Sequence, residues 1–248
     1  MLDAFTIGQL LWSAFVIFGA YVVRGMSGFG AGLVATPLLV FMLPLTVVVP
    51  ATGLVVFVLF VFLTIRDRSE VNWPEFKRLV VPTLLGVAVG LYLFSVLDNR
   101  RMMTGLGWFL IAYAGYMLAV HAMGMPQIKV SERWAFPLGF AGACADTMFG
   151  GGGGTLVVIY MHGRGVSKSE FRATLAVLWF VEMIARIGGY TVSGFYTPST
   201  LMLVVLMLPF MLAGTWVGER INNRISQETF SMILAGMLAL SGVSLLLK

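Results

Sequence analysis

The sequence predicts an all-α polytopic membrane protein. Of its 248 side chains, 59% are hydrophobic and 11% are charged, and the mean hydropathy is +0.94. Soluble domains carry roughly 25% charged residues, so this composition excludes a secreted disulfide scaffold, a disordered chain and a nucleic-acid-binding protein. Cys144 is the single cysteine, and the sequence has no cysteine cluster with metal-ligand spacing. We therefore expect neither a metal site nor a cofactor.

Seven apolar runs are long enough for a membrane helix, which needs about 20 residues. They lie near residues 5–23, 46–65, 79–97, 102–121, 173–190, 199–218 and 229–247. Two further apolar stretches are short or interrupted, at 31–43 and 134–162, and each adjoins a glycine cluster. Because glycine destabilises a helix by about 1 kcal/mol relative to alanine, we expect the clusters at 24–32 and 146–154 to break their helices.

The two glycine clusters are related by an internal duplication, because a shift of 122 residues places the first cluster on the second. Shifts of 122 and 128 residues also match threonines and glycines of the long helices: Thr52 with Thr174, Gly86 with Gly214, and Gly90 with Gly218. The ordered matches predict a first transmembrane repeat at 1–122, a linker at 123–132 and a second repeat at 133–248.

The basic residues predict how the two repeats are oriented, because cytoplasmic loops collect Lys and Arg. If each glycine cluster crosses the membrane once, seven basic residues fall on each side. If each cluster is a hairpin that enters and returns, eleven face one side and three the other. We therefore expect two inverted repeats, each a glycine-rich broken-helix hairpin followed by three transmembrane helices, with both termini on the non-cytoplasmic side.

The broken helices are the predicted substrate site, because paired helix breaks mark midplane sites in transporters. Helices that start near Leu33 and Thr155 would present free N–H groups to an anion, and glycine lets an anion approach the backbone closely. The candidate residues in the two clusters are Ser27, Gly28, Gly30, Gly32, Gly150, Gly151, Gly152, Gly153 and Gly154. Alternatively, glycines only permit close helix packing, which is our interpretation for the four matched glycines of the long helices.

Four charged residues lie in predicted membrane segments, where each costs roughly 2.5–3.5 kcal/mol or more. Arg24 and Asp146 coincide under the 122-residue shift. Either they form an ion pair between the halves, or Arg24 contacts the substrate while Asp146 accepts a proton. Glu182 and Arg186 share a helix face four residues apart, and they form either a structural ion pair or a coupling and gating element. Arg172, at a helix start, either attracts anions to a cytoplasmic mouth or sets topology.

Thr52 and Thr174 are further candidates for substrate binding. Each places a hydroxyl about one turn into its helix. The hydroxyls bond either substrate oxygens or the carbonyl four residues earlier. Their symmetric positions in the duplication favour substrate contact.

These motifs give the chain a resemblance to a known family over essentially its full length. The motifs are Ser27-Gly-Phe-Gly-Ala-Gly32 with the following Pro37, Phe149-Gly-Gly-Gly-Gly-Gly154, Asn72-Trp73 before the helix that carries Gly86 and Gly90, and Arg172-Ala-Thr174. The chain resembles the TauE/SafE family of sulfite exporters. The resemblance implies a permease that moves sulfite or a small organosulfonate, usually outward. The first cluster has fewer glycines than the second, so the two half-sites need not bind alike.

The resulting prediction is a non-enzymatic, multi-pass anion transporter that lies among the lipids of the bacterial inner membrane. We expect its transport to be coupled to protons or sodium, and its glycine faces are compatible with a homodimer. An anion channel of the same architecture is the alternative, because it would use the same glycine N–H groups. An intramembrane serine protease built on Gly25-Met-Ser-Gly28 lacks a histidine at comparable depth. A membrane scaffold would leave the intramembrane charges without a purpose.

Overall fold

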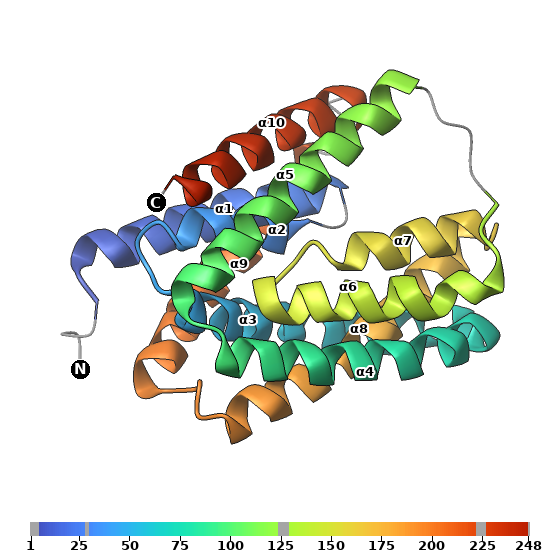
Figure 1. The fold of residues 1–248 in the computed structure, drawn as a ribbon, viewed down its shortest axis with the longest axis horizontal. Coiled ribbons are helices and arrows are strands. Elements are labelled where there is room, and N and C mark those ends of the chain that lie inside the picture. The colour runs from blue at the N-terminus through green and yellow to red at the C-terminus, as the bar shows by residue number, and fades with distance from the viewer. Residues whose placement is uncertain (1–4, 28–29, 124–128, 222–226, 248) are drawn as a thin grey trace. The chain divides into compact units, whose positions relative to one another are not determined.

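The computed structural model describes residues 5–27, 30–123, 129–221 and 227–247, and all regular structure within them is helical (Figure 1). A helix is present at each of the seven predicted segments: α1 (Ile7–Ser27), α3 (Leu45–Asp67), α4 (Trp73–Val96), α5 (Asn99–Met123), α8 (Lys168–Val192), α9 (Pro198–Ile221) and α10 (Gln227–Leu246). The shorter elements are α2 (Ala31–Leu39), α6 (Ala135–Phe149), α7 (Gly154–Gly163) and the 3₁₀ turns η2 (Arg68–Glu70) and η3 (Glu132–Trp134). Within the described residues, five helices are long and apolar enough to cross a membrane: α1, α4, α5, α8 and α9.

The helix breaks fall at both glycine clusters and at equivalent positions. α1 and α6 end within their clusters, at Ser27 and Phe149, and α2 and α7 start within two residues of the positions predicted near Leu33 and Thr155. Gly30 and Gly152, which the 122-residue shift superposes, both have a left-handed backbone, with φ of 90° and 99°. Residues with a side chain rarely adopt this conformation, so glycine is required at both breaks.

Each broken helix folds back on itself as a hairpin. The second arms, α2 and α7, have only 9 and 10 residues, about 15 Å or half of a bilayer core. In the first hairpin, the Trp12 indole donates to the carbonyl of Leu38 at 2.9 Å, so α2 runs back along α1. In the second, the N–H of Val130 donates to the carbonyl of Gly163 at 3.0 Å, so α7 ends where α6 begins. In each hairpin the short second arm therefore runs antiparallel to the first.

The chain forms two compact units, and each unit takes helices from both halves of the sequence. Unit 1 comprises residues 1–52, 97–125 and 196–248, and unit 2 comprises residues 53–96 and 126–195. Unit 1 contains the first hairpin with α5, α9 and α10, whereas unit 2 contains the second hairpin with α4, α8 and most of α3. The predicted division at 1–122 and 133–248 thus concerns the duplication of the sequence and does not follow the compact units.

Glycines allow a helix of one sequence half to pack closely against the hairpin of the other half. In unit 1, a Cβ at Gly214 or Gly218 of α9 would lie less than 3.0 Å from a carbonyl oxygen of α1. In unit 2, a Cβ at Gly86 or Gly90 of α4 would lie equally close to a carbonyl oxygen of α6. The packing interpretation of these four glycines is therefore confirmed, and it explains why the units interleave the two halves.

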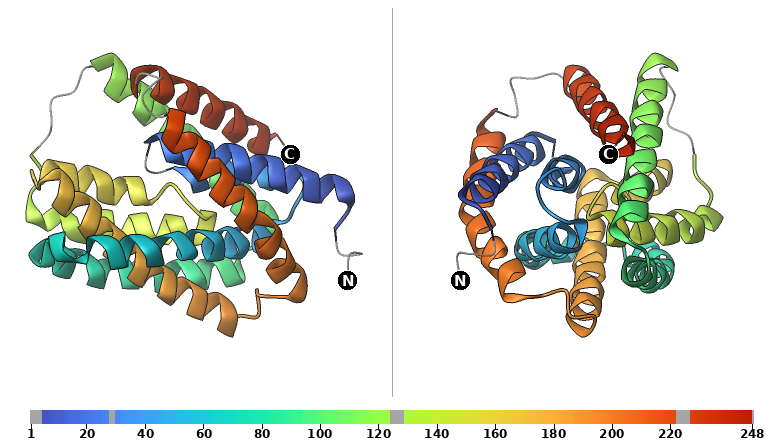
Figure 2. Two further views of the ribbon diagram at one scale, coloured as in Figure 1. Left: turned by 180° about the vertical axis from the view of Figure 1, so that it is seen from behind. Right: turned by 60° about the vertical axis from the view of Figure 1, so that its left-hand side comes forward.

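Helices that the predicted duplication matches with each other also pack in antiparallel pairs. In unit 2, Thr64 of α3 donates to the carbonyl of Ala176 of α8 at 3.2 Å, and the rings of Phe57 and Phe180 stack 5.6 Å apart. In unit 1, α5 and α10 run in opposite directions and lie side by side, as Figures 1 and 2 both show. A Cβ at Gly242 would lie 2.8 Å from the carbonyl oxygen of Gly107, so this pair is also closely packed.

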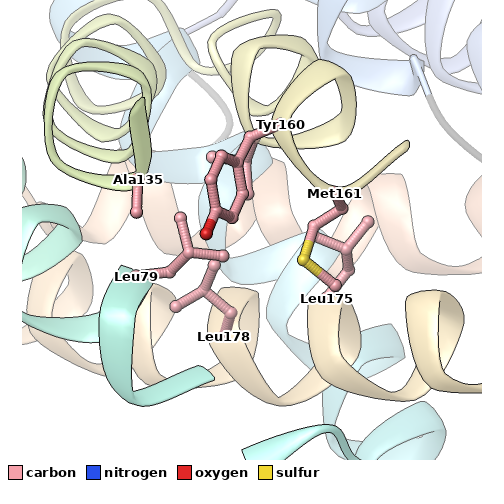
Figure 3. Close-up of a cluster of buried hydrophobic side chains, with 7 residues drawn as sticks. Leu79, Ala135, Tyr160, Met161, Leu175 and Leu178 are labelled. Atoms are coloured by element: carbon pink, nitrogen blue, oxygen red, sulfur yellow. The ribbon is translucent and has the colours of Figure 1, made fainter. Parts of the chain in front are cut away.

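A hydrophobic cluster holds α4, α6, α7 and α8 together in unit 2 (Figure 3). Leu79, Tyr160, Met161 and Leu178 are fully buried in it. Because Tyr160 and Met161 lie in the last turn of α7, the cluster anchors that end of the short helix. The other end of α7 starts at the glycine loop.

Candidate functional site

Asp146 places a buried carboxylate at the glycine loop of the second hairpin. The residue lies in the last turn of α6 and is 7% exposed. Its Oδ1 accepts the backbone N–H of Gly153 at 2.8 Å, and the N–H of Gly154 also hydrogen-bonds the carboxylate. The start of α7 therefore binds an anion, as predicted for a helix N-terminus, but in this structure the anion is a side chain of the protein itself.

A face of α8 brings further ionisable groups to Asp146. Trp179, Glu182, Arg186 and Tyr190 recur at spacings of three and four residues, which places them along one side of the helix. Glu182 and Arg186 are each 2% exposed, and the guanidinium Nη1 lies 3.5 Å from Glu182 Oε1. Arg186 also interacts electrostatically with Asp146. The predicted Glu182–Arg186 pair is thus present and is part of a larger charged cluster.

Arg186 has unused hydrogen-bonding capacity within this cluster. Its Nε and Nη2 are buried and have no hydrogen-bond acceptor among the described residues. Glu182 Oε1 receives no hydrogen bond from those residues either, so its contact with Arg186 is a long ion pair. Burying an unsatisfied donor costs roughly 1–3 kcal/mol, and more for a charged group. Nε and Nη2 form one edge of the planar guanidinium, which is the geometry that binds an oxyanion through two parallel hydrogen bonds.

The glycines of the second loop allow three helices to meet at this cluster. A Cβ at Gly154 would lie 3.2 Å from Asp146 Oδ2 and 3.0 Å from the Trp179 ring. A Cβ at Gly153 would overlap the backbone of Gly142 in α6. The start of α7 can therefore approach α6 and α8 this closely only because its first residues lack side chains. The preceding Gly150, Gly151 and Gly152 form the turn, with left-handed backbone at Gly150 and Gly152.

Arg24 has a different environment, in unit 1. It lies in the last turn of α1 and interacts electrostatically with Tyr21 and Glu219. Asp146, which the 122-residue shift aligns with Arg24, has the partners in unit 2 described above. Each of the two charges that the sequence shift aligns therefore has partners within its own compact unit.

The other predicted residues of the first hairpin are described in part. Gly30 is the left-handed residue before α2, and Gly32 lies in the first turn of that helix. Gly28 and the side chain of Ser27 lie outside the described residues. The first hairpin therefore shares the backbone geometry of the second at Gly30, while its polar side chains differ.

The two threonines and Arg172 are not part of the Arg186 cluster. Both threonine hydroxyls have hydrogen-bond partners within the protein. Thr52 Oγ1 donates to the carbonyl of Val48 at 2.9 Å, which is the alternative bond to a carbonyl four residues earlier. Thr174 Oγ1 accepts the N–H of Asn72 at 2.8 Å. Thr174 precedes Arg186 by twelve residues, about 18 Å along α8. Arg172 is exposed in the first turns of α8.

A second polar cluster lies at the opposite end of α7, and no local sequence pattern pointed to it. Glu75 of α4 is 4% exposed and accepts hydrogen bonds from Tyr160, from Arg164 at 2.9 Å and from Arg78 at 2.8 Å. Both arginines also pair with Glu132, at 2.9 and 3.0 Å. The hydrogen bond to Glu75 raises the pKa of the Arg164 guanidinium. This network ties the end of α7 to α4 and η3.

Replacing Glu75 by glutamine is expected to lower the thermal midpoint of the purified protein by several degrees. The change removes a buried carboxylate that three donors share, and breaking such buried networks costs about 3 kcal/mol or more. Asp98→Asn is the matched control, because Asp98 pairs with Arg101 at 3.3 Å on the surface, where ion pairs contribute about 1 kcal/mol or less. Equal midpoints for the two variants would contradict a structural role of Glu75.

Sequence reasoning found Asp146, Glu182 and Arg186 but missed Tyr190, Glu75, Tyr160 and Arg164. Tyr190 follows Arg186 by four residues, so helical spacing was a usable signal for it. Glu75 is separated from Tyr160 and Arg164 by 85 and 89 residues. No local spacing connects residues so far apart, and only the fold brings them together.

The membrane helices, the paired helix breaks and the charged cluster define a class of protein, the polytopic membrane transporters built on broken helices. The chain matches the family model described as sulfite exporter TauE/SafE over residues 13–245. It therefore belongs to the TauE/SafE sulfite exporter family, which is a family of membrane transporters and not of enzymes. Among curated proteins and among solved structures, nothing matches the chain.

Proposed function

We propose that this transporter exports sulfite or a small organosulfonate across the bacterial inner membrane, and that the anion binds at Arg186. The observation that carries the proposal is the buried guanidinium of Arg186, whose Nε and Nη2 lack acceptors among the described residues, beside the broken helix of the second hairpin. Sulfite and sulfonates carry several oxygens on one sulfur atom, which suits two parallel N–H donors. The N–H groups of Gly153 and Gly154 hydrogen-bond Asp146 in this structure, so they would contact the anion only by exchanging that partner.

The length of α7 supports a site near the membrane midplane. The helix has 10 residues, or about 15 Å, which is half of a hydrocarbon core of about 30 Å. One of its ends meets the charged Glu75 network and the other meets Asp146. If the network marks the cytoplasmic surface, as the basic residues around it predict, the Asp146 end lies at mid-depth.

The antiparallel pairs of corresponding helices support inverted repeats. Repeats related by an axis in the membrane plane place their corresponding helices in opposite directions, and α3 with α8 and α5 with α10 are such pairs. Together with the basic residues, this supports termini on the non-cytoplasmic side. The glycine faces of α4 and α9 are used within the units, so the proposal includes no homodimer built on them.

We extend the proposal to the first hairpin on the basis of the sequence duplication. The residues of the first hairpin that correspond to the site in the second hairpin are Arg24, Ser27, Gly28, Gly30 and Gly32. Gly30 supports this by sharing the left-handed conformation of Gly152. At the Glu75 end of unit 2, exposed Arg172 is proposed to attract anions, and Thr52 and Thr174 remain proposed substrate contacts that would have to exchange their present hydrogen bonds.

The test is a counterflow assay in proteoliposomes loaded with sulfite, thiosulfate, methanesulfonate, taurine, sulfate, acetate or chloride. We expect saturable exchange with sulfite and sulfonates and none with chloride, because chloride has no pair of oxygens for the two parallel donors of Arg186. Acetate, a carboxylate that these donors also fit, measures how far the site selects sulfur oxyanions. A single-channel recording on the same protein addresses the alternative function. Unitary conductance without saturation would replace the carrier by an anion channel, and absence of both exchange and conductance would refute the proposal.

A further inference from the structure

The charge balance of the Arg186 cluster constrains how an anion can be carried. In the described part of unit 2, the charged groups that act on Glu182 are Asp146 from α6 and Arg186 from its own helix, and Arg186 also faces Tyr190. The described residues of α3, α4 and α7 contribute none. Two carboxylates and one guanidinium carry a net charge of −1 when all are ionised. A bound monoanion would make the net charge of the cluster −2. Water is largely excluded from the site, and unbalanced charge is strongly unfavourable there.

The two carboxylates of the cluster are not equivalent. Asp146 accepts backbone N–H groups from the start of α7, with Gly153 at 2.8 Å, and such hydrogen bonds stabilise the ionised form of a carboxyl group. Glu182 Oε1 receives no hydrogen bond from the described residues, and its only ion pair there, with Arg186 Nη1, is 3.5 Å long. Protonation of Glu182 therefore sacrifices fewer stabilising hydrogen bonds than protonation of Asp146.

We propose that Glu182 carries a proton together with each anion, so that transport is electroneutral. The inference rests on the proposed function and adds the coupling ion and the group that binds it. When a monoanion binds Arg186, a proton from water on the loading side forms an O–H bond on Glu182, and the Glu182–Arg186 ion pair opens. The cluster keeps its net charge of −1. On the opposite side the anion dissociates, the O–H bond ionises to water, and Glu182 pairs with Arg186 again.

Proton uptake on binding predicts a specific pH dependence. Binding linked to the uptake of one proton weakens about tenfold per pH unit over the range in which Glu182 is ionised in the free protein and protonated in the complex. Methanesulfonate is the suitable probe, because its sulfonate group stays ionised throughout and contributes no titration of its own. In Glu182→Gln the side chain is permanently neutral, so methanesulfonate binding should no longer vary with pH.

The experiment measures protons moved per methanesulfonate in proteoliposomes that contain a pH-sensitive dye, with the membrane potential clamped. For the wild type we expect one proton per anion. Glu182→Gln should move no protons with the anions it carries. Asp98→Asn is the control, because it removes a carboxylate that pairs with Arg101 on the surface at 3.3 Å, and it should keep the wild-type ratio.

The possible outcomes separate the coupling from the function itself. Net wild-type uptake of labelled methanesulfonate into proteoliposomes free of the anion, without proton movement, would overturn the coupling and leave the anion carrier intact, whereas neither uptake nor exchange would overturn both. Retention of the proton in Glu182→Gln would overturn the choice of Glu182. Should Glu182→Gln be inactive, proton uptake on methanesulfonate binding to purified wild-type protein decides the matter. Binding without proton uptake overturns the proposal.

Discussion

Replacing Arg186 by glutamine, together with Glu182 by glutamine, is expected to lower saturable sulfite exchange at least about 100-fold. The double change removes the two charge-assisted hydrogen bonds proposed for the anion, each worth about 1.5–3 kcal/mol, and tenfold in affinity corresponds to about 1.4 kcal/mol. The pair is changed together because Glu182 without Arg186 would be a buried unpaired carboxylate that costs about 3–5 kcal/mol of stability. Counterflow in proteoliposomes at matched protein content measures the effect.

Two further variants separate the anion contact from general loss of charge. Arg186→Lys keeps the positive charge but loses the planar pair of donors, so we expect an intermediate loss of about tenfold in affinity. Arg101→Gln is the control, because the Arg101 side chain is 74% exposed and pairs with Asp98 on the surface. Normal exchange in the Arg186 and Glu182 double variant would remove Arg186 from the site.

Leucine at Gly152 or at Gly30 is expected to abolish transport while the protein still inserts into the membrane. Both positions have a left-handed backbone, which costs a residue with a side chain about 1–2 kcal/mol. The straightened turn would move the start of the following helix away from its present position. Exchange assays combined with membrane extraction of the variants measure transport and insertion separately.

Gly165→Leu is the matched control for backbone strain. Gly165 also has a left-handed backbone, with φ of 69° and no atom within 4 Å of a built Cβ, but it lies in the turn between α7 and α8. It therefore shares the strain of Gly30 and Gly152 without sharing their place in the hairpins. Normal transport in both hairpin variants would exclude the hairpins from the site, and an equal loss in Gly165→Leu would attribute the effect to strain alone.

The sequence by itself was sufficient for the features that depend on local physics. Hydropathy over about 20 residues predicts a membrane helix, and a helix is present at each of the seven predicted segments. Consecutive glycines predict helix breaks, and both breaks occur where expected. The pairing of Glu182 with Arg186 followed from their four-residue spacing. Each of these features depends on residues close together in the chain, so the sequence contains the information directly.

Tertiary structure alone decided which distant segments meet. The seating of α4 on α6 and of α9 on α1 depends on glycines that face carbonyls of the other sequence half, and no local pattern names the partner helix. Asp146 accepts hydrogen bonds from the N–H groups at the start of α7. Glu75 accepts hydrogen bonds from residues 85 and 89 positions away in the sequence. These contacts form because burying a charge without partners is costly, and which partners are within reach is determined only when the helices have packed.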